Sequence, residues 1–273
     1  MRDYFALAAA FAGLVIPATA QAQTANSWTG LSIGARAGFL NAQNDRNERI
    51  LFDNNLDGTF GDTVRNAAGA DAFTPGFCSG AANDRTPAAG CRKDKDGGDY
   101  AITIGFDQQL GGIVAGLVTE AGRASARDSV SAFSSTPAFY TMTRRLRDNA
   151  AVRGRVGIAL GDTLPYVTGG IAVAKLRRSF ATSNTVNTFT QSGDRTVTGP
   201  RLGGGVEQRF GRLSVGAVYL YTNYKDDDAR VRTAGPAPAT NAFILVNPNG
   251  TDFARSNTRF KTESISGTVS LRF

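Results

Sequence analysis

Eight segments of this chain carry apolar or small residues at every second position. The last segment, residues 260–273, shows the pattern most clearly, because Ser, Thr or Arg stands between successive apolar or glycine residues from Ile265 onward. A period of two is typical of a β-strand with one apolar and one polar face. The segments are residues 28–40, 100–110, 113–123, 151–160, 164–175, 201–210, 213–224 and 260–273. We therefore expect an all-β chain.

The connections between these segments alternate between long and short. The short ones are Gly111-Gly112, Gly161 to Thr163 and Gly211-Arg212, and the others are long and polar. Tight turns at one end and long loops at the other are typical of outer-membrane barrels. A soluble lipocalin-like barrel also has eight strands, but we would not expect strict alternation or an outward apolar register from it. The sequence predicts an eight-stranded antiparallel up-and-down transmembrane β-barrel whose last strand pairs with its first. Its first long outer loop spans residues 43–99.

The N-terminal residues 1–22 have the features of a secretory signal peptide. Arg2 provides a positive charge, residues 4–16 form an apolar run, and small residues stand at Ala18, Ala20 and Ala22. The apolar run is too short for a membrane helix. Cleavage after Ala20 or Ala22 would leave an exported mature chain, with the barrel domain at residues 23–273.

Composition excludes several classes of function. The chain contains no histidine, which removes Ser-His-Asp and Cys-His hydrolysis and His-ligated zinc. After the signal peptide there is no apolar run of the length a membrane helix needs. The net charge of +7 suits contact with an anionic surface such as lipopolysaccharide, whereas nucleic acid is not expected as a partner of an exported chain. We do not expect the protein to be an enzyme.

The chain resembles the opacity-type, porin-like small outer-membrane proteins of Gram-negative alphaproteobacteria. The resemblance rests on WTGLSIGARAGF at the first strand, the glycine-rich second hairpin, AVRGRVGIALGDTLPYVTGGIA at residues 151–172, and the last strand with Phe273. It covers nearly the whole mature chain, although the first outer loop is longer than the family's usual loops. It implies a barrel in the cell outer membrane with a structural, adhesion or receptor role and no wide pore. Phe273 resembles the terminal aromatic residue that the barrel-assembly machinery recognises.

Charged residues fall on the register that faces the barrel interior. An eight-stranded barrel is just filled by side chains, and buried charges must be paired. We therefore expect an ion network in the lumen that blocks it; a narrow, gated ion path is the alternative. The predicted members of the ion network are Arg36, Glu120, Arg153, Arg155 and Glu207.

The first outer loop contains both cysteines, Cys78 and Cys91. Because an exported loop meets an oxidising compartment, we expect a disulfide between them.

The same loop contains the sequence DNNLDGTFGD at residues 53–62, the first half of an EF-hand-like calcium loop. Its predicted ligands are Asp53, Asn55, Asp57, Thr59 through its carbonyl, and Asp62. The bidentate Glu expected at the twelfth position is replaced by Val64. A turn rich in Asp, Asn and Gly, with no bound ion, is the other interpretation.

Further basic residues lie near the predicted outer strand ends. They are Arg144, Arg145, Arg147, Lys175, Arg177 and Arg178. They could pair with lipopolysaccharide phosphates or be solvated loop charges. Trp28 is expected at the interfacial aromatic girdle.

The leading functional hypothesis is an outer-membrane barrel with a structural or surface-interaction role in envelope integrity, adhesion or reception of a surface ligand. A narrow passive porin-like channel is the alternative.

Overall fold

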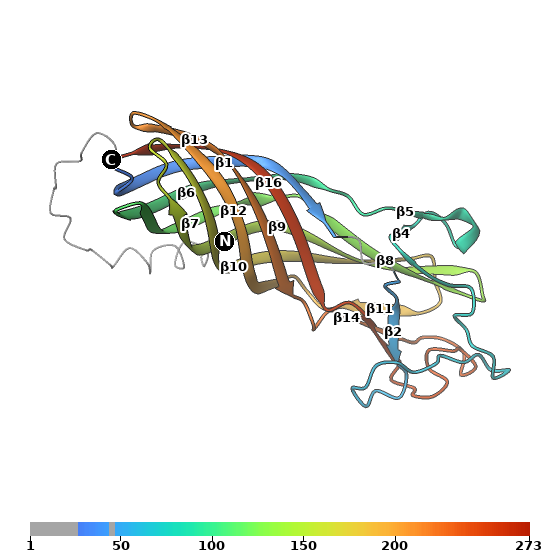
Figure 1. Ribbon diagram of the computed structural model, residues 1–273. Helices are drawn as coiled ribbons and strands as arrows, with labels where there is room; N and C mark the ends of the chain where they lie inside the picture. Colours follow the sequence, from blue (N-terminus) through green and yellow to red (C-terminus); the bar gives the residue numbers. More distant parts are fainter. Residues whose placement is uncertain (1–26, 44–46) are drawn as a thin grey trace.

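Eight long antiparallel strands close into a barrel in the computed structural model, which describes residues 27–43 and 47–273 (Figure 1). The predicted signal peptide, residues 1–22, lies outside the described residues. The barrel strands are β1 (Gly30–Ala42), β6 (Gly97–Leu110), β7 (Ile113–Ala124), β9 (Ala138–Ile158), β10 (Thr163–Thr182), β12 (Arg195–Phe210), β13 (Leu213–Lys225) and β16 (Arg259–Arg272). Each pairs with the next barrel strand along the chain, and β16 returns to β1. The predicted up-and-down barrel is confirmed.

The two faces of the barrel wall differ sharply in polarity. On β10, Ile171 is 66% exposed whereas the next residue, Ala172, is fully buried. Every barrel strand contributes such outward apolar side chains, among them Ile33, Ile102, Leu117, Val156, Ile171, Leu202, Tyr219 and Ile265. Serine, glycine and charged residues alternate with them and face the interior. The outside of the barrel is thus a continuous apolar band, which for a water-soluble surface would be unusually large.

The short turns all lie at one end of the barrel, which we call the turn end. They join β6 to β7, β9 to β10 and β12 to β13. The one helical segment in the described part of the chain is the single 3₁₀ turn η1 (Pro87–Ala89). None of the described residues forms a helix with the length and apolar character needed to span a membrane.

The long connections are folded rather than irregular. They contain the strands β2 (Ile50–Asp53), β3 (Gly76–Ser79), β4 (Ala81–Ala82), β5 (Cys91–Arg92), β8 (Arg127–Ser134), β11 (Thr188–Gln191), β14 (Arg230–Ala234) and β15 (Thr251–Arg255). The expected start of β12 was wrong, since the strand begins at Arg195 instead of Arg201, and two other limits were further off: β9 begins at Ala138 instead of Ala151, and β10 runs to Thr182 instead of Lys175. Beyond the barrel these two strands continue as a sheet to which β8 and β3 add, while β11, β14, β15 and β2 form a second sheet.

These two sheets enclose a hydrophobic core of their own at the end of the barrel opposite the turns, and we call this region the cap (Figure 1). Phe253 of β15 is fully buried at its centre, with ring centroids 5.0 Å from Phe52 and 5.4 Å from Phe243. Tyr140 of β9 lies 5.8 Å from Phe253, and Phe189 of β11 lies 6.4 Å from it. Aromatic rings from three of the long connections therefore share one core with Tyr140, and Val130 and Ala132 of β8 bring the remaining connection into it. This shared core fixes the four connections relative to one another.

Replacing Phe253 with alanine should loosen the whole cap and leave the barrel closed. The cavity left by the ring should lower the free energy of unfolding of the cap by about 3–5 kcal/mol, as for other buried aromatic residues. Limited proteolysis should then cut all four long connections, while the heat-modifiable gel migration of a folded barrel persists. Val186→Ala, at a cap position that is 54% exposed, is the control. Protease resistance equal to that of the wild type would contradict a shared core.

Candidate functional site

The barrel interior holds a cluster of three arginines around one carboxylate. Glu120 of β7 is 4% exposed and accepts hydrogen bonds from Arg36 Nε at 3.2 Å and Arg153 Nη2 at 2.9 Å. Arg201 of β12 also contacts it. Asp99 of β6 supplies a second carboxylate, 2.5 Å from Arg36 Nη1. The cluster thereby joins β1, β6, β7, β9 and β12 across the lumen.

A second cluster lies nearer the turn end and alternates in charge. Arg155 of β9 donates from Nε to Asp107 Oδ1 at 2.7 Å and from Nη1 to Glu207 Oε1 at 2.5 Å. Arg272 of β16 bridges the same two carboxylates, at 2.9 Å each. Gly116 of β7 makes room for the Asp107 carboxylate, because a Cβ at position 116 would collide with it. Four side chains from four strands thus neutralise one another in pairs.

The structure places all five predicted lumen residues in the interior, divided between these two clusters. Glu120 binds Arg36 and Arg153, and Glu207 binds Arg155. Sequence reasoning missed the partners Asp99, Asp107, Arg201 and Arg272. All four lie on the inward register of their strands, so the same alternation contained the signal.

Trp28 closes the turn end of the lumen and does not lie at an interfacial girdle, so that expectation was wrong. It is fully buried, and its Nε1 donates to the Gly161 carbonyl at 3.0 Å. The guanidinium carbons of Arg209 and Arg272 lie 5.1 and 4.6 Å from the ring centroid. Two cation–π contacts away from water stabilise the indole there.

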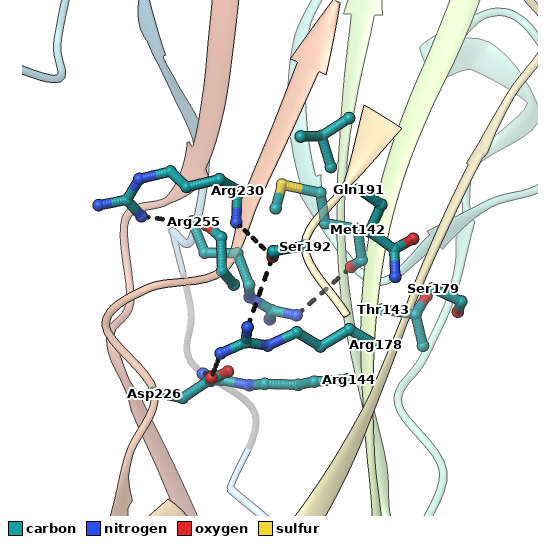
Figure 2. A pocket seen from close by; sticks show the side chains of 12 residues that line it. Met142, Thr143, Arg144, Arg178, Ser179, Gln191, Ser192, Asp226, Arg230 and Arg255 are labelled. Atoms are coloured by element: carbon teal, nitrogen blue, oxygen red, sulfur yellow. Dashed lines mark hydrogen bonds and ion pairs between the residues drawn. The ribbon is translucent and has the colours of Figure 1, made fainter. Parts of the chain in front are cut away.

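A third charged cluster lies where the barrel meets the cap (Figure 2). Arg255 of β15 binds Glu48 at 2.7 Å and Asp128 at 2.8 Å, and Arg144 of β9 binds the other oxygen of Asp128 at 2.6 Å. Arg178 of β10 lies beside Arg144, and both contact Asp226 (Figure 2). The space left among these side chains is about 10 Å³, roughly that of a single water.

This cluster corrects the expectation for Arg144 and Arg178, which are neither solvated loop charges nor exposed to lipopolysaccharide. Arg144 is 1% exposed, and the side chain of Arg178 is 5% exposed. Both point inward because Asp128 and Asp226 offer buried carboxylates there, and an unpaired buried arginine would be costly. Arg145 and Arg177, their neighbours in sequence, face the opposite side of the sheet.

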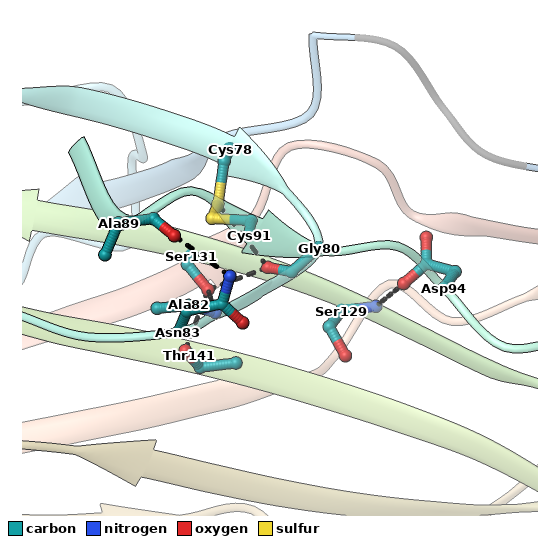
Figure 3. Close-up of a disulfide and its surroundings, with 10 residues drawn as sticks. All are labelled: Cys78, Gly80, Ala82, Asn83, Ala89, Cys91, Asp94, Ser129, Ser131 and Thr141. Carbon is teal, nitrogen blue, oxygen red and sulfur yellow. Dashed lines mark hydrogen bonds between the residues drawn. A yellow bond between two sulfur atoms is a disulfide. The ribbon is translucent and has the colours of Figure 1, made fainter. Parts of the chain in front are cut away.

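The predicted disulfide between Cys78 and Cys91 is confirmed (Figure 3). The two Cα atoms are 6.5 Å apart, and the bond closes the hairpin formed by β4 and β5. We call residues 78–92 the disulfide hairpin. It is held against β8, since Ser131 Oγ accepts from Ala82 N at 2.9 Å and donates to the Gly80 carbonyl at 2.8 Å. The disulfide and the Ser131 hydrogen bonds therefore fix the disulfide hairpin against the part of the sheet that extends beyond the barrel.

The predicted calcium ligands form a tight turn. Asp53 accepts the amide hydrogens of Asp57 and Gly58, at 3.2 and 2.9 Å. Asn55 Oδ1 accepts from Asp57 N, Asp57 Oδ1 from Thr59 N, and Asp62 Oδ2 from Asn54 N. These oxygens are engaged with backbone amides, and no group of three or more Asp, Glu, Cys or His side chains among the described residues forms a metal site. The geometry favours the turn interpretation, and calcium binding stays a prediction.

Comparison of the sequence with models of known protein families, and with characterised proteins, finds no match.

Replacing Glu120 with glutamine should destabilise the barrel strongly. Arg36, Arg153 and Arg201 would lose their shared counter-charge, and breaking a buried ion cluster costs about 3–5 kcal/mol. Arg123→Gln is the matched control, because the Arg123–Asp148 pair is 63% and 54% exposed and such pairs contribute at most about 1 kcal/mol. Urea unfolding in detergent micelles measures both. Equal decreases in the free energy of unfolding for the two variants would contradict the role of Glu120.

Asp94 should make the cap less stable as the pH rises. Burial and the nearby carboxylate of Asp128 raise the pKa of Asp94 to about 7, opposed by the Ser129 N–H and Arg255. The folded state then holds the proton more tightly than the unfolded chain, so stability present at acidic pH is lost as the pH approaches this pKa.

Asp94→Asn keeps the acceptor that Ser129 N uses at 2.7 Å (Figure 3) but cannot ionise. The melting temperature of this variant should rise relative to wild type between about pH 5 and about pH 8. Asp96→Asn, at an exposed position of the same segment, is the control. A difference between Asp94→Asn and wild type that does not change with pH would refute the effect.

Proposed function

We propose that this protein is an outer-membrane β-barrel of a Gram-negative bacterium, with a structural and surface-interaction role and no catalytic one. The observation that carries the proposal is that the distribution of polarity is the reverse of that in a water-soluble protein. Outward side chains such as Ile171 and Ile265 are apolar and 66% and 65% exposed, while inward ones such as Glu120 and Arg155 are charged and buried. In water this arrangement would expose its apolar side, whereas in a bilayer both faces are satisfied.

The closed sheet supports the same assignment. A chain that crosses a bilayer must pair its backbone N–H and C=O groups internally. Pairing of β16 with β1 on one side and β13 on the other leaves no open edge in the barrel wall.

The interior supports a sealed barrel. Arginines from opposite walls meet on shared carboxylates, as Arg36 and Arg201 do on Glu120. Trp28 covers the turn end, and the cluster around Arg255 fills the junction with the cap. Such clusters hold the wall together and occupy the space that a solute would need.

The cap is the part that would meet partners outside the cell. Its shared aromatic core and its disulfide give a fixed surface, which suits envelope integrity, adhesion or reception of a surface ligand. The resemblance to opacity-type outer-membrane proteins favours the same roles. Outer-membrane lipid, lipopolysaccharide and the barrel-assembly machinery are the other partners we propose.

A narrow passive channel is the second candidate. Several buried polar atoms in the lumen, including Asp99 Oδ1, Asn149 Nδ2 and Arg153 Nε, have no hydrogen-bond partner within the described part of the chain. Such atoms can hold water, and a chain of waters would form a path for small ions.

Planar-bilayer recordings separate the two candidates. We expect the wild-type protein to insert without stable conductance steps, with protease protection of the barrel in matched vesicles as proof of insertion. Stable steps from inserted protein would contradict a sealed barrel and support the channel. Failure to insert, with the purified barrel folded, would contradict the membrane assignment itself.

A further inference from the structure

A groove of about 640 Å³ lies on the outer face of the sheet extension in the cap. Its floor is formed by β8, β9 and β10, and its wall by the disulfide hairpin, with Ala81, Ala82 and Arg92 lining it. Phe139 and Ala181 add apolar surface, and Thr141 and Thr143 add polar surface. The wall is rigid, because the disulfide and Ser131 hold the hairpin in place (Figure 3).

Three arginines stand side by side on the floor of this groove. Arg127 of β8 is directly opposite Arg145 of β9, and Arg145 is directly opposite Arg177 of β10. Side chains paired in this way have Cβ atoms about 4.5–5.5 Å apart, and like charges so placed repel each other. Arg92 extends the positive charge onto the wall.

The row is short of counter-charge, unlike the arginines of the lumen. Arg177 has an acidic neighbour, Asp194, at 3.9 Å in a pair whose side chains are 55% and 41% exposed. Within the described residues, neither Arg127 nor Arg145 has a carboxylate within ion-pair distance. The same strands give the buried Arg144 and Arg178 good partners. A fold that pairs its inner arginines this closely leaves the outer row available for an anion.

The row lies just beyond the apolar band of the barrel. On the outward register of β10, Ile171 and Val173 belong to the band, and Arg177 follows four residues after Val173. Val173 and Arg177 are therefore about 13 Å apart along the strand. A lipid whose acyl chains lie against the band would place its headgroup at the level of the row.

We propose that this groove binds the phosphate groups of a lipid headgroup in the outer leaflet. The proposal rests on the membrane insertion proposed above. Planar guanidinium groups bind phosphate oxygens in pairs, and adjacent arginines on neighbouring strands can engage one phosphate together. Bound phosphate would also relieve the repulsion within the row.

The test compares binding of diphosphorylated lipid A by wild-type protein and by the triple variant Arg127→Gln, Arg145→Gln, Arg177→Gln. Native mass spectrometry in dodecyl maltoside micelles measures the bound lipid. A double variant, Arg49→Gln and Arg212→Gln, is the charge control, since these residues lie outside both the groove and the disulfide hairpin. Fully dephosphorylated lipid A and inorganic phosphate are the comparison ligands.

We expect the triple variant to lose at least about tenfold in affinity for lipid A, and the control to keep it. The triple variant should melt at or above the wild-type temperature, because it removes repulsion, so loss of binding would not reflect misfolding. Opening the disulfide with Cys78→Ser and Cys91→Ser should weaken binding by releasing the wall that carries Arg92.

Three results would overturn the inference: equal affinity of the triple variant and wild type, equal binding of dephosphorylated lipid, or inorganic phosphate competing as effectively as lipid A. The last would indicate a free-anion site. Protease protection in vesicles, measured in parallel, separates this failure from that of the proposed function. Insertion without phosphate selectivity refutes the groove assignment, and absence of insertion refutes both.

Discussion

Closure of the sheet by the pairing of β16 with β1 is the constraint on which the other features depend. Ile33 is opposite Leu271, and Arg36 is opposite Thr268, so apolar residues of both strands face outward together and polar ones face inward. A slip of one residue would exchange the two faces of a strand. It would put Arg36 on the apolar band and an isoleucine into the charged interior. The register is therefore specified by the cost of misplacing charge as well as by hydrogen bonding.

Once the barrel is closed, its interior must accommodate the inward charges. Isolated buried arginines would be unstable, and the chain solves this by placing carboxylates on strands that face one another across the lumen. Glu120 is shared by Arg36, Arg153 and Arg201, and Asp107 by Arg155 and Arg272. Apart from the Glu120–Arg153 contact between the neighbouring strands β7 and β9, these contacts join strands that share no backbone hydrogen bonds. The buried arginines inside are closely paired, whereas the arginine row on the outer face of the cap has one exposed acidic partner, Asp194. This difference distinguishes residues that hold the wall together from residues available to a ligand.

The barrel could be predicted from the sequence because its signal is local. Alternation within each strand identified the strands, and the inward register identified the five lumen charges. The extension of β9 was missed because its outward residues, including Thr141 and Arg145, are polar, and its apolar residues, including Tyr140, face a core made by other segments. That core joins Phe52, Phe73, Phe189, Phe243 and Phe253 from distant parts of the chain, so no window of sequence contains it. Arg144 and Arg145 are adjacent, yet one is buried and the other faces the groove, a difference that depends on strand pairing the sequence did not reveal.

The central claim is that the apolar band faces lipid while the cap faces water. Nitroxide spin labels on single cysteines introduced at Ile102, Ile171 and Val206 test it most directly, with Leu245 of the cap as the aqueous reference. In vesicles containing the inserted protein, collision rates with oxygen should exceed those with a water-soluble nickel complex at the three band positions, and the order should reverse at Leu245. Equal access of the nickel complex to Ile171 and Leu245 would contradict the account.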